Sequence, residues 1–290
     1  MKIKAKQNLM GWLFLAPAGI MIIIMAFVPI FRALYNSFHS GVGANMTWVG
    51  IANFTRMFQD RVFMQSLRNN FFYLIIQVPI MIVLGLILAT MLNNPKLKFR
   101  NVFRTAIFLP SATALVAYSI IFRSLFATDG FINFILVGVG ILETNFNFFG
   151  DPTWARIIII LGLVWRWTGF NMVFYLAGLQ NIDYSTFEAA KIDGANAMQT
   201  FFKVTVPQLK PVILMTTIMS TNGTLQLFDE SMNLTNGGPG ISSITMSHHI
   251  FNQTFGGSRN FGYASALSFV ILIIVAILAL IQMKVGDSRD

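Results

Sequence analysis

Six long apolar segments constrain the fold of this chain more than any other feature of its sequence. A helix that crosses a membrane needs about 20 mostly apolar residues. Six segments come close to or exceed that length, over residues 10–35, 71–92, 103–126, 155–180, 211–228 and 263–283. The chain is 55% hydrophobic and 11% charged, which is too apolar for a soluble domain of 290 residues. We therefore predict an all-α integral membrane protein with six transmembrane helices.

The first apolar segment has some features of a secretory signal. Three lysines precede it, and Ala16-Pro17-Ala18 has the composition of a cleavage site. However, the apolar run continues to Phe31, whereas the apolar part of a signal peptide spans about 7–15 residues. An uncleaved first span fits the sequence better.

Lysine and arginine are distributed unevenly between alternate connections, and these residues favour the cytoplasmic side of a membrane. The asymmetry predicts that both termini are cytoplasmic, and topology and anionic lipid then explain the net charge of +9 better than nucleic-acid binding does. With the N-terminus inside, the inner side holds Lys2, Lys4, Lys6, Lys96, Lys98, Arg100, Arg104, Lys191, Lys203, Lys210, Lys284 and Arg289, and the outer side holds Arg56, Arg61, Arg68, Arg123, Arg156 and Arg259.

The chain shows no internal repeat and no low-complexity tail, so we predict one membrane domain over residues 1–290. It contains no cysteine, which excludes disulfides and cysteine metal sites. Asp229-Glu230 and His248-His249 could form a metal site, but polar residues at the outer end of a span more often lie at the membrane interface. We expect no metal site and an interfacial position for the acidic pair.

Residues 181–210 form a long polar connection that the predicted topology places in the cytoplasm. Ser185-Thr186-Phe187-Glu188 has the capping-box pattern, which predicts a helix from Thr186 onward to about residue 197. Gly194 either lies inside this helix, at a cost of about 0.5–1 kcal/mol, or ends it and turns the chain into a second amphipathic piece over 198–206. An amphipathic helix on the inner leaflet is an alternative interpretation.

Among the six apolar segments, the fourth and the fifth contain the polar residues of interest. Aromatic faces with amide and hydroxyl groups suit sugar binding, although small polar residues also serve helix packing in membranes. As a group, these residues favour a cavity near the middle of the bilayer. They are Trp165, Trp167, Thr168 and Asn171 in the fourth segment, and Ser220, Asn222, Thr224 and Gln226 in the fifth.

Arg166 is a charged residue near the middle of a span. Such a charge costs about 2.5–3.5 kcal/mol on insertion scales and usually faces the bundle interior or a watery cavity. The sequence leaves three placements open, since Arg166 could face the pore, pair with a carboxylate or extend to the membrane surface.

The polar connection also carries a family resemblance. It resembles the EAA loop of ATP-binding-cassette importer permeases, and its longer form is similar to the carbohydrate-uptake branch, the MalF-like and UgpA-like permeases. Further similarity covers essentially the whole chain. The matching residues are Glu188-Ala189-Ala190, Asp193-Gly194, Val204-Thr205-Val206-Pro207, Phe108-Leu109-Pro110, Leu176-Ala177-Gly178-Leu179-Gln180 and Thr235-Asn236-Gly237-Gly238-Pro239.

The resemblance implies the six-helix type I importer core (MetI/MalF-like) and a coupling helix that docks on a cytoplasmic ATPase. The implied ATPase-coupling residues are Glu188, Ala189, Ala190, Asp193, Gly194 and Pro207. The implied sugar contacts are Thr168, Gly169, Met172, Ser220, Gly223, Thr224 and Leu227, to which the residue types add Trp165, Arg166 and Asn171 as substrate-path candidates.

The resemblance also implies partners and a cargo. The expected assembly contains a second homologous permease, in a heterodimer, two ATPase subunits and an extracellular solute-binding protein, all at a bacterial plasma membrane. The expected cargo is a sugar or oligosaccharide, with a glycerol-phosphate-like or other polar solute as the alternative.

No nucleotide site is expected in this chain. A phosphate-binding P-loop needs a Gly-Lys pair, which the sequence lacks, so ATP and magnesium would be used by the partner ATPase and this chain would bind no cofactor.

A secondary carrier would need paired acids within the spans. A membrane enzyme would need a nucleophile or metal ligands at depth, whereas His39, His248 and His249 lie at outer edges. We therefore predict a non-catalytic transport subunit.

Overall fold

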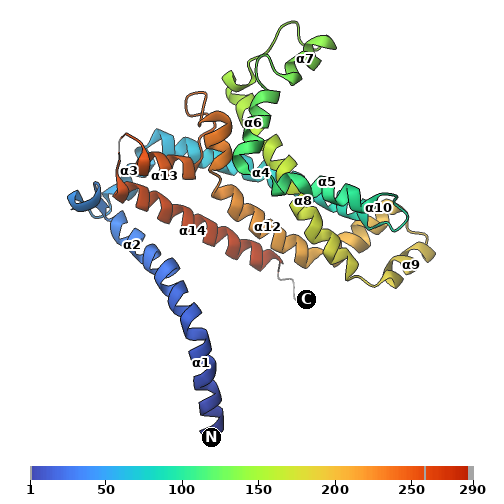
Figure 1. The fold of residues 1–290 in the computed structure, drawn as a ribbon, viewed down its shortest axis with the longest axis horizontal. Helices are drawn as coiled ribbons and strands as arrows, with labels where there is room; N and C mark the ends of the chain where they lie inside the picture. The colour runs from blue at the N-terminus through green and yellow to red at the C-terminus, as the bar shows by residue number, and fades with distance from the viewer. Residues whose placement is uncertain (1, 258, 287–290) are drawn as a thin grey trace. The chain divides into compact units, whose positions relative to one another are not determined.

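The structure is a computed structural model that describes residues 2–257 and 259–286, so Arg289 lies outside the described residues. The described part is helical almost throughout (Figure 1), which confirms the predicted all-α class. Two strands of two residues each, β1 (His39–Ser40) and β2 (Thr47–Trp48), pair antiparallel with His39 opposite Trp48.

The chain forms two compact units. The first comprises Met1–Asp60 and Ile250–Leu272, and the second comprises Arg61–His249 and Ile273–Asp290. The single permease domain predicted from the sequence stays a prediction. The first unit contains, besides the two strands, α1 (Lys2–Ile22), η1 (Ile23–Phe27), α2 (Val28–Ser37), η2 (Gly43–Asn45), α3 (Ala52–Gln59) and parts of α13 (Met246–Phe255) and α14 (Phe261–Gly286).

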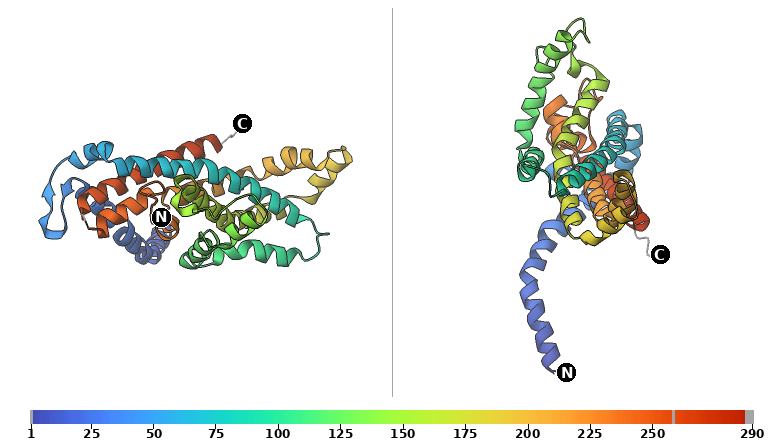
Figure 2. Two further views of the ribbon diagram at one scale, coloured as in Figure 1. Left: turned by 90° about the horizontal axis from the view of Figure 1, so that it is seen from above. Right: turned by 90° about the vertical axis from the view of Figure 1, so that its right-hand side faces the viewer.

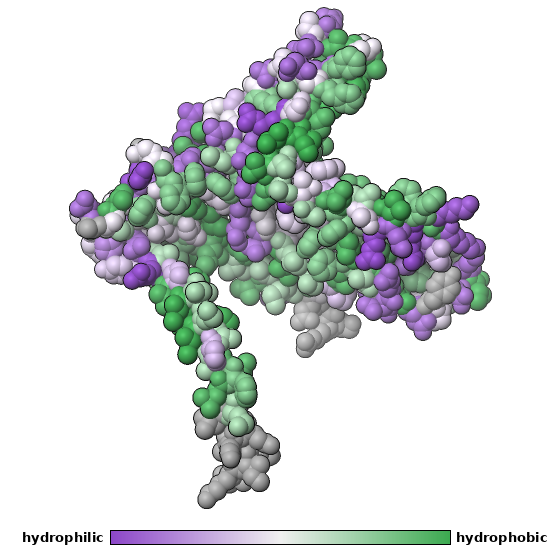
Figure 3. Space-filling view, viewed as in Figure 1, coloured by the Kyte–Doolittle hydropathy of each residue, from purple (hydrophilic) through white to green (hydrophobic). Residues whose placement is uncertain are grey.

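Apolar side chains cover the helical run from α1 to α2 (Figure 3). From Met10 to Ser37 this run is long and apolar enough to cross a membrane, and Phe14, for example, is 82% exposed in the isolated chain. Such exposure suits a helix that contacts lipid or another protein. Elsewhere in this unit, the Tyr263 hydroxyl donates to Asp60 at 2.7 Å and the Arg56 guanidinium lies 4.1 Å above the Tyr263 ring.

The second unit is built on three packed helices, α4 (Arg61–Asn93), α8 (Pro152–Gln180) and α12 (Lys210–Leu225). Tyr175 joins all three, because its hydroxyl lies 2.8 Å from Thr216 Oγ1 and its ring fills the space beside Gly85. Figure 2 shows the same helices from two further directions. The other elements of this unit are α5 (Arg100–Ala112), α6 (Leu115–Leu125), α7 (Phe131–Gly138), η3 (Phe148–Gly150), α9 (Tyr184–Ile192), α10 (Ala197–Thr200), η4 (Phe201–Thr205), α11 (Val206–Gln208), η5 (Ser231–Thr235) and the remainder of α13 and α14.

The third predicted span, 103–126, is bent rather than continuous. Helices α5 and α6 meet at an angle of 98°, where Thr113 and Ala114 adopt extended backbone. Pro110 cannot donate a backbone hydrogen bond near the end of α5. In addition, Ser111 and Thr113 bond back to the carbonyl oxygens of Phe108 and Leu109, at 2.7 and 3.2 Å. These local bonds compete with helix continuation, which the apolar composition alone did not reveal.

Within the described residues, four helices are long and apolar enough to span a membrane, or five if the bent pair counts as one span. The four cover predicted spans one, two, four and six. The fifth predicted span falls on α12, which has 16 residues and ends at Leu225. The count of six spans therefore stays a prediction.

Candidate substrate cavity and coupling loop

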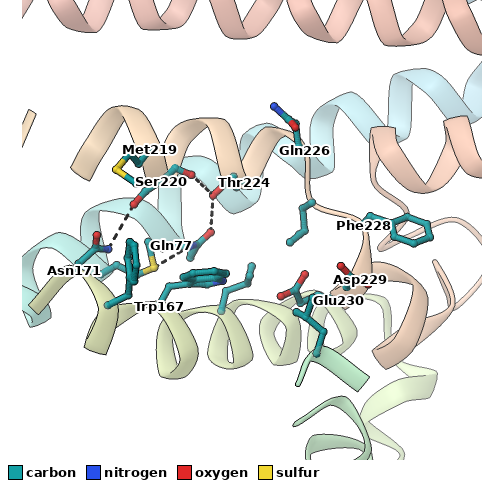
Figure 4. Close-up of a pocket in the computed structure, with 16 residues that line it drawn as sticks. Gln77, Trp167, Asn171, Met219, Ser220, Thr224, Gln226, Phe228, Asp229 and Glu230 are labelled. Atoms are coloured by element: carbon teal, nitrogen blue, oxygen red, sulfur yellow. Dashed lines mark hydrogen bonds between the residues drawn. The ribbon is translucent and has the colours of Figure 1, made fainter. Parts of the chain in front are cut away.

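A cavity of about 530 Å³ lies between α8 and α12, with α4 contributing to its wall (Figure 4). Its size matches the pockets of about 300–1,000 Å³ that hold small ligands. The lining combines aromatic, aliphatic, amide, hydroxyl and carboxylate groups. It comprises Gln77, Met81, Leu115, Leu163, Trp167, Phe170, Asn171, Met219, Ser220, Gly223, Thr224, Gln226, Leu227, Phe228, Asp229 and Glu230.

The polar groups of the wall are paired with one another across the helices. The Thr224 hydroxyl lies 3.0 Å from Gln77 Oε1 and 2.8 Å from the Ser220 carbonyl oxygen, so these two acceptors share one proton. Asn171 Nδ2 lies 3.5 Å from Ser220 Oγ, at the outer limit of a hydrogen bond. Because these bonds are weak or shared, a polar ligand can replace them without leaving a buried group unpaired.

One of the two tryptophans on α8 contributes to the cavity. Trp167 lines the wall and meets the Phe170 ring edge to face at 5.7 Å. Trp165 instead packs on the Phe122 and Tyr118 rings, at 5.6 and 6.4 Å between ring centroids. Residues two apart on a helix point in different directions, so only one of the pair can face the cavity.

The structure brings five of the ten predicted substrate-path residues together around the cavity: Asn171, Ser220, Gly223, Thr224 and Leu227. The other five, Trp165, Arg166, Thr168, Gly169 and Met172, do not line it.

Two of these five pack between helices. At Gly169, an added Cβ would overlap the Ile107 carbonyl of α5, so this glycine allows α5 and α8 to approach closely. Met172 is fully buried in a core cluster with Tyr175 and Leu176. A small or apolar residue on α8 suits either a cavity or helix packing. Here both Gly169 and Met172 serve helix packing.

Arg166 is 6% exposed and rests on aromatic rings. Its Cζ atom lies 5.2 Å from the Tyr118 ring centroid and 5.3 Å from that of Trp167, which is a cation–π arrangement. Its Nε and Nη1 atoms are buried without a hydrogen-bond partner. Thus the side chain neither lines the cavity nor extends to the membrane surface, and its charge acts on nearby Glu230.

Sequence reasoning missed the contribution of α4 and of the acidic pair. Gln77 is a polar residue inside the apolar run Ile75-Ile76-Gln77-Val78, and this isolated amide was the available signal. Glu230 is 3% exposed and forms part of the cavity wall with its neighbour, and the interfacial position expected for the pair stays a prediction.

The polar connection folds into short helices with well-defined ends. Helix α9 begins at Tyr184, two residues before the predicted start, because Asp183 rather than Ser185 caps it and accepts from the Ser185 backbone N–H at 3.1 Å. This bond lowers the pKa of the Asp183 carboxyl below its ordinary value. Because α9 ends at Ile192, the predicted extension to residue 197 is also wrong.

Gly194 ends the first helix, as the second interpretation of the sequence predicted. Its φ is +76°, in the left-handed region that glycine adopts without strain, and an added Cβ would meet no atom within 4 Å. The chain then enters α10 through a capping box that the sequence analysis missed. Asn196 and Gln199 bond reciprocally to each other's backbone N–H, both at 2.9 Å.

The six predicted coupling residues lie on the outside of this connection. Glu188, Ala189, Asp193, Gly194 and Pro207 are exposed and Ala190 is partly exposed. Large apolar side chains are exposed beside them, since Ile192 is 85%, Met198 68% and Phe202 60% exposed. Figure 3 shows that hydrophilic residues gather over the α9–α10 region, so these apolar groups stand within a polar surface.

A second connection contains a turn over Thr235–Gly240, within the segment that carries part of the family resemblance. Asn236 and Gly237 have positive φ, and the Ser243 hydroxyl donates to the Gly238 carbonyl oxygen at 2.6 Å. Ser231 Oγ lies 2.9 Å from His248 Nδ1, and burial lowers the pKa of His248, which favours its neutral form. The Ser243 bond ties the turn to the segment that follows it.

Comparison with known proteins identifies the family to which this chain belongs. Residues 81–285 match the family described as binding-protein-dependent transport system inner membrane component. The chain belongs to this family and is therefore a multi-pass membrane permease subunit of a transport system, as predicted.

Several characterised relatives span nearly the whole chain. It is 48% identical over 289 residues to the lactose transport system permease protein LacF of Rhizobium radiobacter, covering 99% of this chain and 97% of the relative. It is 32% identical to the multiple sugar-binding transport system permease protein MsmF of Streptococcus mutans, covering 99% and 98% of the two chains.

The fold is also similar to solved structures. A chain of a bacterial ABC transporter that imports the acidic polysaccharide alginate aligns with a TM-score of 0.84 at 22% identity, covering 99% of this chain and 98% of that chain. A complex of the alginate transporter with its alginate pentasaccharide-bound periplasmic protein gives a TM-score of 0.86 at 21% identity, covering 99% and 97%. At this identity the similarity supports the predicted type I importer fold and nothing further.

Proposed function

We propose that this chain is one permease half of an ATP-driven importer whose cargo is a sugar, with a disaccharide of the lactose type as the first candidate. The observation that carries the proposal is the cavity between α8 and α12, where an aromatic wall faces amide and hydroxyl groups in a space of about 530 Å³. The relatives named for lactose and multiple-sugar transport support the choice of cargo.

The cavity wall would bind the cargo through groups that already bond to each other. Asn171, Ser220 and Thr224 present amide and hydroxyl groups, and Trp167 presents an aromatic surface. Sugar hydroxyls would replace the weak or shared bonds described above, so binding and release would both remain accessible. Weak binding suits a transporter, because a cargo held tightly would not leave.

The polar connection 181–210 would receive the mechanical input. We assign the coupling role to Glu188, Ala189, Ala190, Asp193, Gly194 and Pro207, on a surface where Ile192 and Met198 are exposed. Exposed apolar groups within a polar surface suit contact with another protein. The base of the connection is anchored, since Leu209 is 1% exposed and packs in the core cluster of α4 and α8.

The proposed assembly contains a second permease, two ATPase subunits that use ATP and magnesium, and an extracellular solute-binding protein. Both termini would be cytoplasmic. ATPase closure would displace α9 and α10, and the shift would pass through Leu209 to α12 and the cavity, alternating access between the two sides.

Affinity purification of the tagged chain from its native membranes tests the proposal. Mass spectrometry of the eluate should identify a second permease and an ATPase. ATP hydrolysis should rise when one solute-binding protein and its sugar are added. A chain recovered alone and without ATPase activity would contradict the proposed assembly and favour a secondary carrier.

A further inference from the structure

Two carboxylates close one end of the cavity. Asp229 and Glu230 are consecutive residues between α12 and η5, and both line the cavity (Figure 4). Glu230 is 3% exposed and Asp229 is partly buried. The other side chains that line the cavity in the described part of the chain are amides, hydroxyls, thioethers and apolar groups. The lining therefore contains two acidic side chains and no basic one.

The buried cation on α8 does not reverse this sign. Arg166 does not line the cavity, and its guanidinium rests on Tyr118 and on Trp167, which does line it. A molecule in the cavity thus meets the Trp167 side chain and not the guanidinium. Burial raises the pKa of the Glu230 carboxyl, and nearby Arg166 only partly opposes this shift. The sign of the cavity is therefore set by the Asp229 carboxylate.

This charge pattern distinguishes neutral from anionic cargo. Charges interact far more strongly in a partly buried site than in water, and like charges brought close together there repel. A neutral sugar instead donates its hydroxyls to a carboxylate, and such charge-assisted hydrogen bonds are about twice as strong as neutral ones. Both side chains would bond to the hydroxyls of a neutral polyol, and the Asp229 carboxylate would repel a sugar acid or a phosphate ester.

We infer that Asp229 and Glu230 make the cavity selective for uncharged sugars and against anionic ones. The inference rests on the proposed sugar function and sharpens it, because it excludes uronates and glycerol-phosphate-like solutes as cargo of this permease.

The test compares three probes of similar size: lactose, lactitol and lactobionate. Lactitol and lactobionate share the galactose unit and an open-chain end, and they differ in a terminal CH₂OH against a carboxylate. Binding would be measured by saturation-transfer NMR on the complete transporter in nanodiscs, without the solute-binding protein, so that selectivity is read at the permease.

The expected result is that the wild-type transporter binds lactose and lactitol similarly and lactobionate about tenfold more weakly or worse. Asp229→Asn and Glu230→Gln keep the side-chain size and remove one carboxyl group each. Asp229→Asn should narrow the difference between lactitol and lactobionate more than Glu230→Gln does, because burial raises the pKa of Glu230. Glu143→Gln, which neutralises an exposed acid that does not line the cavity, should leave that difference unchanged.

The two possible failures are distinct. If wild-type transporter binds lactobionate as tightly as lactitol, the charge selectivity is overturned while the sugar function stands. If it binds neither lactose nor lactitol, the lactose-type cargo is overturned together with the inference. The comparison of lactitol and lactobionate binding by the wild-type transporter tests the inference without any variant. The test therefore remains valid even if a variant is unstable.

Discussion

The cavity and the connection 181–210 use polar and apolar side chains in opposite ways. In the cavity, polar groups such as Gln77 and Thr224 bond to each other across helices. In the connection, the polar groups of Asp183 and Asn196 cap helices, and the apolar side chains Ile192 and Met198 are exposed. In the first arrangement, a small polar ligand can replace the bonds between the wall groups. The second arrangement suits binding of another protein, which would cover the exposed apolar side chains.

The largest expected effect tests the connection side of this comparison. Gly194→Asp should abolish sugar uptake, because it places a charge at a position proposed to contact the ATPase, and an unpaired charge buried in an interface costs about 3–5 kcal/mol. Gly194→Asn has nearly the same size and also tolerates the positive φ of +76°, so it should retain most uptake. Uptake into membrane vesicles, normalised to permease level by immunoblot, measures both variants.

The Asp and Asn variants separate charge from backbone strain. Equal loss of uptake in both would assign the effect to the backbone. Normal uptake by an Asp variant present at normal level would remove Gly194 from the coupling surface.

A large effect on stability is expected at the contact that closes α5 onto α8. Gly169→Ala should destabilise the protein by about 1–3 kcal/mol, because the new methyl group overlaps the Ile107 carbonyl. Gly223→Ala is the control, since its added Cβ meets no atom within 4 Å, and alanine there should be neutral or stabilising by about 0.5–1 kcal/mol. Thermal unfolding in detergent compares the two, and equal midpoints would refute the packing role of Gly169.

A smaller effect is expected inside the cavity. Thr224→Val removes the hydroxyl that donates toward Gln77 Oε1 and leaves that buried acceptor unpaired. Because the proton is shared with the Ser220 carbonyl oxygen, the expected cost is about 1 kcal/mol, the lower end for a lost buried bond. Thr224→Ser keeps the hydroxyl and should cost less. Thermal unfolding in detergent measures the difference, and a valine variant as stable as the serine variant would show that the bond contributes little.

The smallest effect concerns the cap of α9. The pKa of Asp183 is lowered in the folded chain, so its contribution is fully present above the ordinary aspartate pKa and is lost as the pH falls through the lowered value. Hydrogen exchange at the first amides of α9 should therefore be no less protected at pH 5 than at pH 8, once corrected for the intrinsic rate. Asp183→Ala should lose protection there at both values, whereas Asp183→Asn should keep it.

The sequence predicted the helical class and offered a turn at Gly194 as one of two interpretations, because each has a local signature. Five of its ten substrate-path candidates line the cavity, and their role in transport stays a prediction. Prediction from the sequence failed where one sequence pattern is compatible with two different structures. Asp183 and Ser185 are both good capping residues, and only the folded chain shows which one is used. A glycine such as Gly169 serves equally in a cavity or between helices, and only the position of Ile107 decides. The single amide Gln77 was hidden within an apolar run.

Photo-cross-linking tests whether the connection 181–210 contacts an ATPase. The chain has no cysteine, so a single Ile192→Cys can carry a maleimide benzophenone at the tip of α9 without background labelling. Ile75→Cys is the matched control, because Ile75 is 66% exposed on the apolar helix α4. Position 192 is expected to cross-link to the ATPase, and position 75 is not. A labelled, transport-competent Ile192→Cys protein that never cross-links to the ATPase would contradict the proposed contact.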